Sequence, residues 1–166
     1  PLIQKLPKAG KIKKETENKT LGFKELTLSN GIKVVLKKSD YKKDEVRMTG
    51  ECAGGSSLYG MDDWANLQLF DEVIGVSGLG NFSSTELQKV LAGKNANVNL
   101  SLANLHEYVS GSCTPKDMET MFQMNYLYFT NIKKDEQAIG NLLNQYKMAL
   151  KNNALSPESA LSASLQ

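Results

Sequence analysis

Apolar residues recur along this chain with two different periods, and the periods predict the order of its elements. Alternation of apolar and polar residues predicts strands over 23–28, 32–37, 45–53, 95–102 and 105–113. Spacings of three and four predict helices over 62–74, from 83 to about 93, from 115 to about 130 and over 133–152, with a further helix beginning at Ser156-Pro157. This order predicts an α+β fold, an antiparallel sheet with helices packed on one face.

Short motifs mark the ends of several elements. The Ser-Asn-Gly sequence at 29–31 predicts a hairpin with a type I′ turn, because Asn and Gly accept positive φ. Ser83 and Glu86 have the spacing of a capping box. Thr114-Pro115 supplies an N-cap followed by Pro at the first helical position.

The helix predicted over 62–74 follows a Gly-Ser loop at 54–57 and carries an apolar face. Trp64, Leu67, Phe70 and Ile74 are spaced by three and four, so we expect these side chains in the core. The helix over 115–130 is apolar nearly all round, which predicts that it is buried.

The first 22 residues carry no sustained periodicity and are rich in lysine. This composition predicts a mobile or loosely draped linker over 1–22, with the module itself over 23–166. The rival interpretation is that Leu2, Ile3 and Leu6 fold back as an extra strand or a docked segment. Because the chain begins with Pro rather than Met, we interpret it as a piece of a longer chain.

Charge is unevenly distributed. Residues 1–50 hold 13 Lys and Arg against 6 Asp and Glu, and the remainder holds 7 against 12. A basic end can bind nucleic acid or anionic lipid. No aromatic side chain lies between Pro1 and Gly22 on which bases could stack, and the lysines are spaced out, so a solvated linker is favoured. No run of 18 apolar residues predicts a membrane span.

Candidate residues for metal and redox chemistry are few. Cys52 and Cys113 lack metal-site or CxxC spacing and are expected to be small buried thiols in strands. A disulfide between them stays open as an alternative. His106 is the only histidine, and a lone histidine cannot make a zinc site. Its strand position is expected to face solvent or a partner.

Familiar catalytic motifs are missing from the sequence. It contains no HExxH or reversed form, no GxSxG and no P-loop. Gly78-Leu79-Gly80 has no third glycine at the required spacing. The acid pairs Asp62-Asp63 and Asp135-Glu136 lie at helix starts, where interaction with free N–H groups explains them.

One group of motifs resembles a known family. LTLSNGIKVVLKKSD, at 26–40, is similar to the opening hairpin of a half-module of the insulinase or pitrilysin-type (inverzincin) zinc metallopeptidases. Gly54-Gly55-Ser56-Ser57-Leu58 matches the family's Gly-Ser loop, which precedes a helix bearing H-x-x-E-H. On that alignment the two histidines fall on Asn66 and Phe70, the glutamate on Leu69 and the distal glutamate ligand near Leu142.

The resemblance implies a partial, metal-free half-module over 23–166, joined by 1–22 to a zinc-bearing half of the parent chain. Amide and apolar groups at the motif positions imply that this fragment is inactive and holds no zinc, while the other half binds zinc and cleaves peptides. The metal-free half would help to enclose the peptide substrate in a chamber. A parent in the bacterial periplasm or at the cell surface is the family expectation.

A second hypothesis is a peptidase-derived structural or interaction module without proteolytic role, like the core subunits of respiratory complexes that share this fold. The discriminating observation is the sequence upstream of Pro1. An H-x-x-E-H motif there favours the peptidase.

Overall fold

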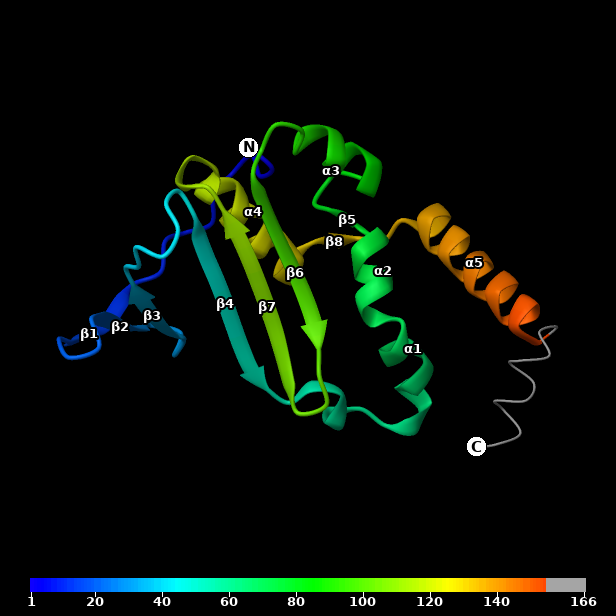
Figure 1. Cartoon of the computed structure of the whole chain (residues 1–166), viewed down its shortest axis with the longest axis horizontal. Coiled ribbons are helices and arrows are strands. Elements are labelled where there is room, and N and C mark those ends of the chain that lie inside the picture. The colour runs from blue at the N-terminus through cyan, green and yellow to red at the C-terminus, as the bar shows by residue number, and fades with distance from the viewer. Residues whose placement is uncertain (155–166) are drawn as a thin grey trace. The chain divides into compact units, whose positions relative to one another are not determined.

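The predicted elements occur in the expected order, with three further strands (Figure 1). The structure is a computed structural model that describes residues 1–154, so the helix predicted from Ser156-Pro157 lies outside the described residues. The chain divides into two units, one formed by Ile3–Glu45 and the other by Pro1–Leu2 together with the chain from Val46 onward. Both units contain antiparallel sheets, and the second also contains the helices, which confirms the α+β class.

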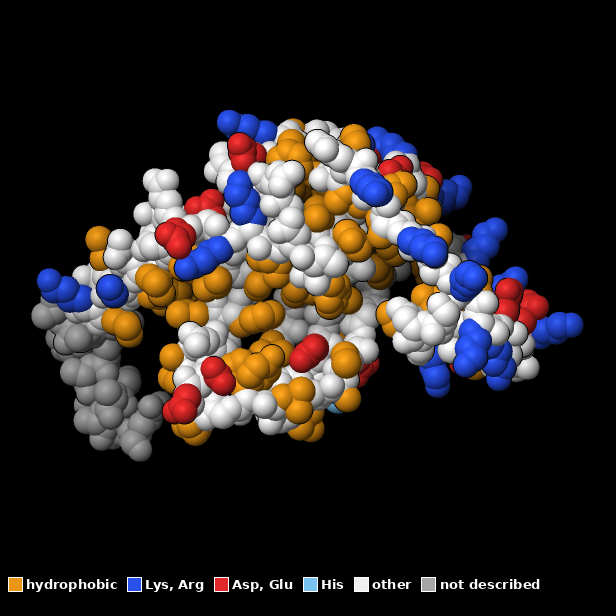
Figure 2. Space-filling model, turned by 180° about the vertical axis from the view of Figure 1, so that it is seen from behind, with side chains coloured by type: hydrophobic (Ala, Val, Ile, Leu, Met, Phe, Trp, Pro, Cys, Tyr) orange, Lys and Arg blue, Asp and Glu red, His pale blue; other side chains and the backbone are white. Residues whose placement is uncertain are grey.

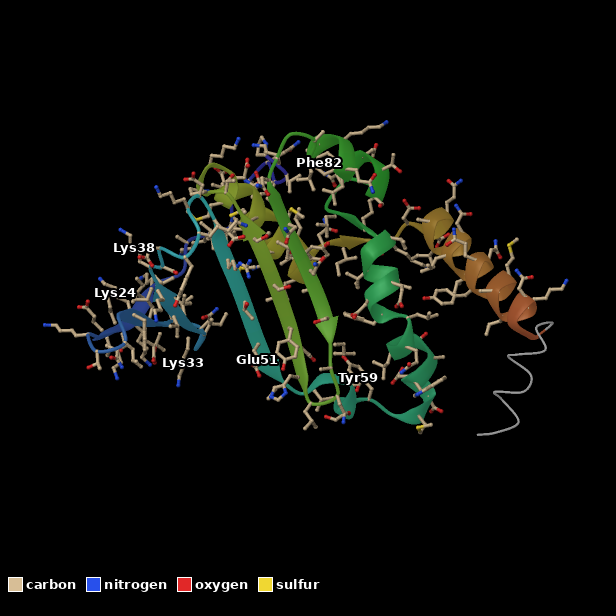
Figure 3. All side chains as sticks on the ribbon, in the orientation of Figure 1. Lys24, Lys33, Lys38, Glu51, Tyr59 and Phe82 are labelled. Atoms are coloured by element: carbon tan, nitrogen blue, oxygen red, sulfur yellow. The ribbon has the colours of Figure 1, made fainter. Side chains whose placement is uncertain are left out.

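The unit Ile3–Glu45 is a three-stranded antiparallel sheet. Its strands are β1 (Ile12–Asn18), β2 (Phe23–Leu28) and β3 (Lys33–Lys37), in the order β1-β2-β3. Lysine side chains such as Lys24 and Lys33 project from the strands (Figure 3). No side chain of Ile3–Glu45 is fully buried, so backbone pairing rather than a core defines this unit.

The hairpin at 29–31 is confirmed, but the predicted turn type is wrong. The Gly31 N–H donates to the Leu28 carbonyl at 3.0 Å, and the Leu28 N–H donates to the Ile32 carbonyl at 2.9 Å. In this three-residue loop Gly31 has φ +91, whereas Asn30 does not take positive φ. A type I′ turn needs positive φ at both central residues, so the loop belongs to the class in which a glycine follows the turn.

The first 22 residues are not the irregular segment that their composition predicted. Residues 12–18 form β1, paired with β2 from Asn18↔Phe23 to Ile12↔Leu28. A turn at Gly22, with φ +66 and its N–H donating to the Asn18 carbonyl at 2.8 Å, joins the two strands. The strand escaped prediction because it pairs through its backbone while its side chains stay largely exposed, and hydrophobic periodicity reports only burial.

The second unit is built on another three-stranded antiparallel sheet. Its strands are β4 (Val46–Ala53), β6 (Ala96–Leu102) and β7 (His106–Cys113), in the order β4-β7-β6. The hairpin 23–37 therefore lies in a different sheet from strand 46–53, and the single predicted sheet is split. One face of β6 and β7 packs against α4 (Met118–Thr130), which follows the 3-10 turn η3 (Pro115–Asp117).

The core lies between this sheet and α4. Val98 and Cys113 from the strands are buried, as are Met121, Met124 and Leu127 from the helix. The two-residue strands β5 (Gly78–Leu79) and β8 (Ile132–Lys133) pair beside α4 and bury Leu79. Helix α4 is buried on one side only, contrary to the prediction, because Phe122 and Phe129 are exposed.

The remaining helices lie around this layer. They are η1 (Gly55–Leu58), η2 (Met61–Asp63), α1 (Trp64–Gln68), α2 (Phe70–Val76), α3 (Ser84–Val90) and α5 (Glu136–Ala154). The predicted capping box of α3 is confirmed, with Ser83 and Glu86 bonded in both directions. Helix α2 contacts β6 and α5.

The N-terminus also departs from the linker prediction. Leu2 is buried, and its N–H donates to the Oε1 of Gln123 on α4 at 2.6 Å. Gln123 is buried as well and donates from Nε2 to Glu119 at 2.8 Å. The docked interpretation therefore holds for Leu2, whereas Leu6 is exposed.

Candidate functional site

The Gly-Ser loop at 54–58 docks on the turn between β6 and β7. The N–H groups of Gly54, Ser56 and Ser57 donate to the carbonyls of Leu105, Ala103 and Asn104 at 2.8 to 2.9 Å. Gly55 has φ +65, and a Cβ there would lie 2.3 Å from the Ala103 carbonyl oxygen. Only glycine fits at position 55, so the Gly-Ser sequence is explained by packing. The docked loop fixes the point at which the chain leaves the sheet and enters the following helix.

The helix after this loop is interrupted. The chain runs as η2, α1 and α2, and Leu69 separates the last two with φ −105 and ψ 7. A single helix over 62–74 was expected. Two ligands at positions i and i+4 share one face only on a continuous helix. The interruption falls on the position of the motif's glutamate.

The predicted apolar face of this helix is not core. Trp64 is 56% exposed, and Leu67, Phe70 and Ile74 are half-buried. No residue of α1 or α2 is fully buried. The periodicity identified the side that faces the protein, but within residues 1–154 that side is only partly covered.

The four motif positions lie on neighbouring elements. Asn66 on α1 is exposed, Leu69 and Phe70 at the start of α2 are half-buried, and Leu142 is half-buried on α5, which contacts α2. An amide and three hydrocarbon side chains provide no anionic or imidazole ligand for a metal. These residues can pack two helices together but have no group that activates water.

A hydrogen bond links the two helices that carry these positions. The Tyr146 hydroxyl on α5 donates to the Glu72 Oε1 on α2 at 3.1 Å. This hydrogen bond raises the pKa of Tyr146, with burial and the negative charge of Glu72 acting in the same direction. Sequence reasoning missed the pair, because 74 residues separate its members and no local motif joins them.

Asp117 forms a polar centre that sequence reasoning also missed. Its Oδ2 accepts from the Asn95 N–H and the Thr114 hydroxyl, both at 2.9 Å, and its Oδ1 lies 3.5 Å from the Lys94 Nζ. The Asn95 N–H is the main reason that the pKa of Asp117 is lowered. A detectable signal was the Thr114-x-x-Asp117 spacing of a capping box. This carboxylate ties the start of β6 to the start of α4 and is structural.

The cysteines and the histidine lie apart from the motif positions. Both thiols are free, and Cys113 is buried, which raises its pKa. Cys52 is exposed, so the expectation of two buried thiols is wrong for Cys52, which lies near the end of strand β4. His106 is half-buried and places its Nε2 3.4 Å from the Oε1 of Glu51, which projects from β4 (Figure 3).

Two further findings concern metals and membranes. Within residues 1–154, no three His, Cys, Asp or Glu side chains are grouped so that they could hold a metal ion. Over the same described part of the chain, no helix combines the length and apolar character needed to span a bilayer.

Comparisons with known proteins agree with the motif resemblance. The chain is 27% identical over 140 residues to an Arabidopsis thaliana protein named "Zinc protease PQQL-like", an alignment that covers 84% of this chain and 12% of that protein. No family model matches the sequence. The similarity to a zinc protease, together with the fold, confirms the resemblance to insulinase-type peptidases.

Two solved structures share the fold. The periplasmic protease PqqL of Escherichia coli superposes with a TM-score of 0.79 at 21% identity, over 98% of this chain and 18% of PqqL. A mutant of the ferredoxin protease FusC, solved in complex with Arabidopsis ferredoxin, superposes with a TM-score of 0.82 at 16% identity, over 99% of this chain and 18% of FusC. The chain thus spans less than a fifth of the length of each of these proteins.

Proposed function

We propose that this chain is part of the metal-free half of an insulinase-type zinc peptidase and helps to enclose the peptide that a zinc-bearing half cleaves. The observation that carries the proposal is the helix after the Gly-Ser loop. In a fold shared with proteases, its motif positions hold Asn66, Leu69 and Phe70. A half-module of this kind contributes walls and packing, not water activation.

The geometry of the helix pair supports the same assignment. A catalytic zinc site needs three protein ligands and an open position for water. On the alignment of the resemblance the distal ligand falls near Leu142 on α5, and the Tyr146 hydroxyl on the same helix donates to Glu72 on α2. In this proposal, contacts between protein groups of α2 and α5 stand where the zinc-bearing half holds its metal.

The chain covers only a small share of each relative, which supports a place within a larger enzyme. We propose that this enzyme cleaves peptides and that its other half binds the zinc. Residues 1–22 would connect the two halves. The description of Escherichia coli PqqL as a periplasmic protease supports a periplasmic or cell-surface location.

The test compares the 166-residue chain with the product of the complete reading frame that contains it. We expect an H-x-x-E-H motif outside the present sequence, one tightly bound zinc per longer chain, and peptidase activity that a substitution of the motif glutamate abolishes. The 166-residue chain, purified without chelator, should contain no stoichiometric zinc. Stoichiometric zinc in the short chain, or a reading frame without any zinc motif, would refute the proposal and favour a scaffold role.

A further inference from the structure

The outward side of α4 carries an apolar stripe that no other described element of its own unit covers. Met118, Phe122, Tyr126 and Phe129 are spaced by three and four, so they lie on one side of the helix. All four are exposed, Phe129 by 66% and Phe122 by 49%. On the side from which Figure 2 is drawn, hydrophobic side chains gather across the centre of the molecule.

Helix α4 has few charged residues, as is typical of a helix that packs against protein on both sides. Glu119 is its only charged residue in thirteen positions. A helix with one face in water normally places charged residues on that face, and the centres of protein interfaces are depleted of charge and enriched in aromatic residues and Met. The outward stripe therefore has the chemistry of a buried interface rather than of a solvated surface.

The matching structures indicate what covers the stripe. Nearly the whole of this chain, 98% and 99%, superposes on proteins of which it forms only 18%. Proteins of that length contain much additional polypeptide beyond the part that superposes on this chain, and that polypeptide is available to pack on the helix. One flank of α4 already accepts a distant segment in this structure, since Leu2 is buried there and bonds to Gln123, which lies 121 residues away.

We infer that the stripe Met118, Phe122, Tyr126 and Phe129 is the surface on which the remainder of a longer chain packs. The occupant is further polypeptide of the same chain, not a second copy or a separate protein. The inference rests on the proposed function in one respect, that both place this sequence within a longer chain. It does not depend on zinc or on peptidase activity.

Methionine oxidation tests the inference with a matched pair on one helix. Met118 lies in the stripe and is 42% exposed, whereas Met121 is 0% exposed on the core side. Peroxide converts exposed methionine to the sulfoxide, and mass spectrometry reads the rate at each position. In the 166-residue chain we expect fast oxidation of Met118 and slow oxidation of Met121. In the longer chain, Met118 should slow to the rate of Met121.

Each other outcome is decisive. Slow oxidation of Met118 in the 166-residue chain itself would overturn the inference, and so would fast oxidation of Met118 in the longer chain. A self-associated short chain, detected by sedimentation and protecting Met118, would assign the stripe to a second copy. A reading frame without additional sequence would also overturn it. A protected Met118 in a longer chain without zinc or activity would refute the proposed function alone.

Substitutions provide an independent arm. Phe122→Ser combined with Phe129→Ser should lower the unfolding midpoint of the longer chain more than that of the short chain, because only in the longer chain are both rings fully buried. The matched control combines Tyr59→Ser with Met61→Ser, which are also exposed but lie outside the stripe. The control should change neither protein. Equal effects of the stripe variant in both chains would contradict the inference.

Discussion

The two three-stranded sheets differ in what packs on them. Both β1-β2-β3 and β4-β7-β6 are entirely antiparallel. The sheet β4-β7-β6 has α4 against one face and contains or borders most buried apolar side chains, whereas no side chain of Ile3–Glu45 is fully buried. Strand pairing satisfies the backbone in both sheets, but only one of them has a hydrophobic core.

This difference predicts where the stability of the chain resides. A sheet of a few strands needs a hydrophobic face packed against something to be stable by itself. The unit Ile3–Glu45 also carries twelve lysines against six acidic residues, so its own charges repel. We therefore expect changes in the sheet β4-β7-β6 to govern global unfolding, and equivalent changes in β1-β2-β3 to have smaller effects.

The largest expected effect is loss of core volume under α4. Met121→Ala should destabilise the chain by about 2–5 kcal/mol, the usual range for truncating a fully buried methionine. Leu26→Ala in the centre of β2 should cost roughly 1 kcal/mol, because that side chain is only half-buried. Urea unfolding followed by circular dichroism measures both, with Met118→Ala as the exposed control. Equal losses for Met121 and Leu26 would remove the distinction between the sheets.

The second expected effect concerns one glycine in each region. Gly55→Ala should cost at least about 2 kcal/mol, since positive φ is strained for alanine and the Cβ would meet the Ala103 carbonyl. Gly31→Ala should cost only the conformational strain, about 1–2 kcal/mol, because nothing lies within 4 Å of the added Cβ. The difference between their urea midpoints isolates the clash. A smaller effect at Gly55 would mean that the loop does not dock as described.

These contrasts also explain how far the sequence could predict the fold. Alternation located β2, β4, β6 and β7, and spacings of three and four located α3, α4 and α5, because each has a side that is less exposed than the other. Strand β1 buries almost nothing and left no such pattern. Periodicity likewise could not tell that, within residues 1–154, the apolar face of α2 is only half-buried and the outward side of α4 is exposed.

Only the order of the candidate site's parts could be predicted from the sequence, and their detailed geometry could not. The Gly-Ser loop and the motif positions Asn66, Leu69, Phe70 and Leu142 came from resemblance, and the structure places the loop and helices in the expected succession. The interruption at Leu69 and the contact between Tyr146 and Glu72 depend on tertiary packing and carry no local signal. Phe70 was expected in the core, but it is only half-buried, so Phe70→Ala should cost less than Met121→Ala.

The third prediction uses acid to separate the two regions. The pKa of Asp117 is lowered in the folded chain, so its contribution to stability is fully present above its unfolded pKa of about 4 and is lost as the pH falls through the folded pKa. Asp117→Asn should therefore flatten the decline of the urea midpoint below about pH 4. The pKa of Glu86 is lowered by the Ser83 N–H, so Glu86→Gln and the double variant are needed as controls.

The exposed ion pair of the other sheet supplies the contrast. Lys24 lies 3.1 Å from Glu15, and this hydrogen bond raises the pKa of Lys24. Its contribution is present below the unfolded pKa of the lysine and is lost in alkali, as the pH rises through the folded value. Glu15→Gln should therefore weaken the decline of the urea midpoint at the alkaline end. An unchanged alkaline decline in that variant would show that the pair adds nothing to the stability of this sheet.

The smallest expected effect lies outside the core formed by the sheet β4-β7-β6 and α4, where the Tyr146 side chain joins α5 to α2. Since the hydrogen bond to Glu72 raises the pKa of this phenol, Tyr146 should ionise above the usual pKa of a tyrosine side chain. Absorbance at alkaline pH, with Tyr146→Phe to assign the transition, measures that pKa. Glu72→Gln should lower it, because the negative charge and the charged acceptor are both removed.

Stability should respond to this pair only slightly, because both side chains are exposed and water replaces the lost hydrogen bond. The sign follows from the raised pKa: the contribution is present below the unfolded pKa near 10 and falls as the pH rises through the folded value. Tyr146→Phe should therefore shift the urea midpoint little at neutral pH, far less than Met121→Ala. A loss of stability as large as that of Met121→Ala would mean that α5 unfolds together with the core. The cooperative unit would then extend beyond the sheet β4-β7-β6 and α4.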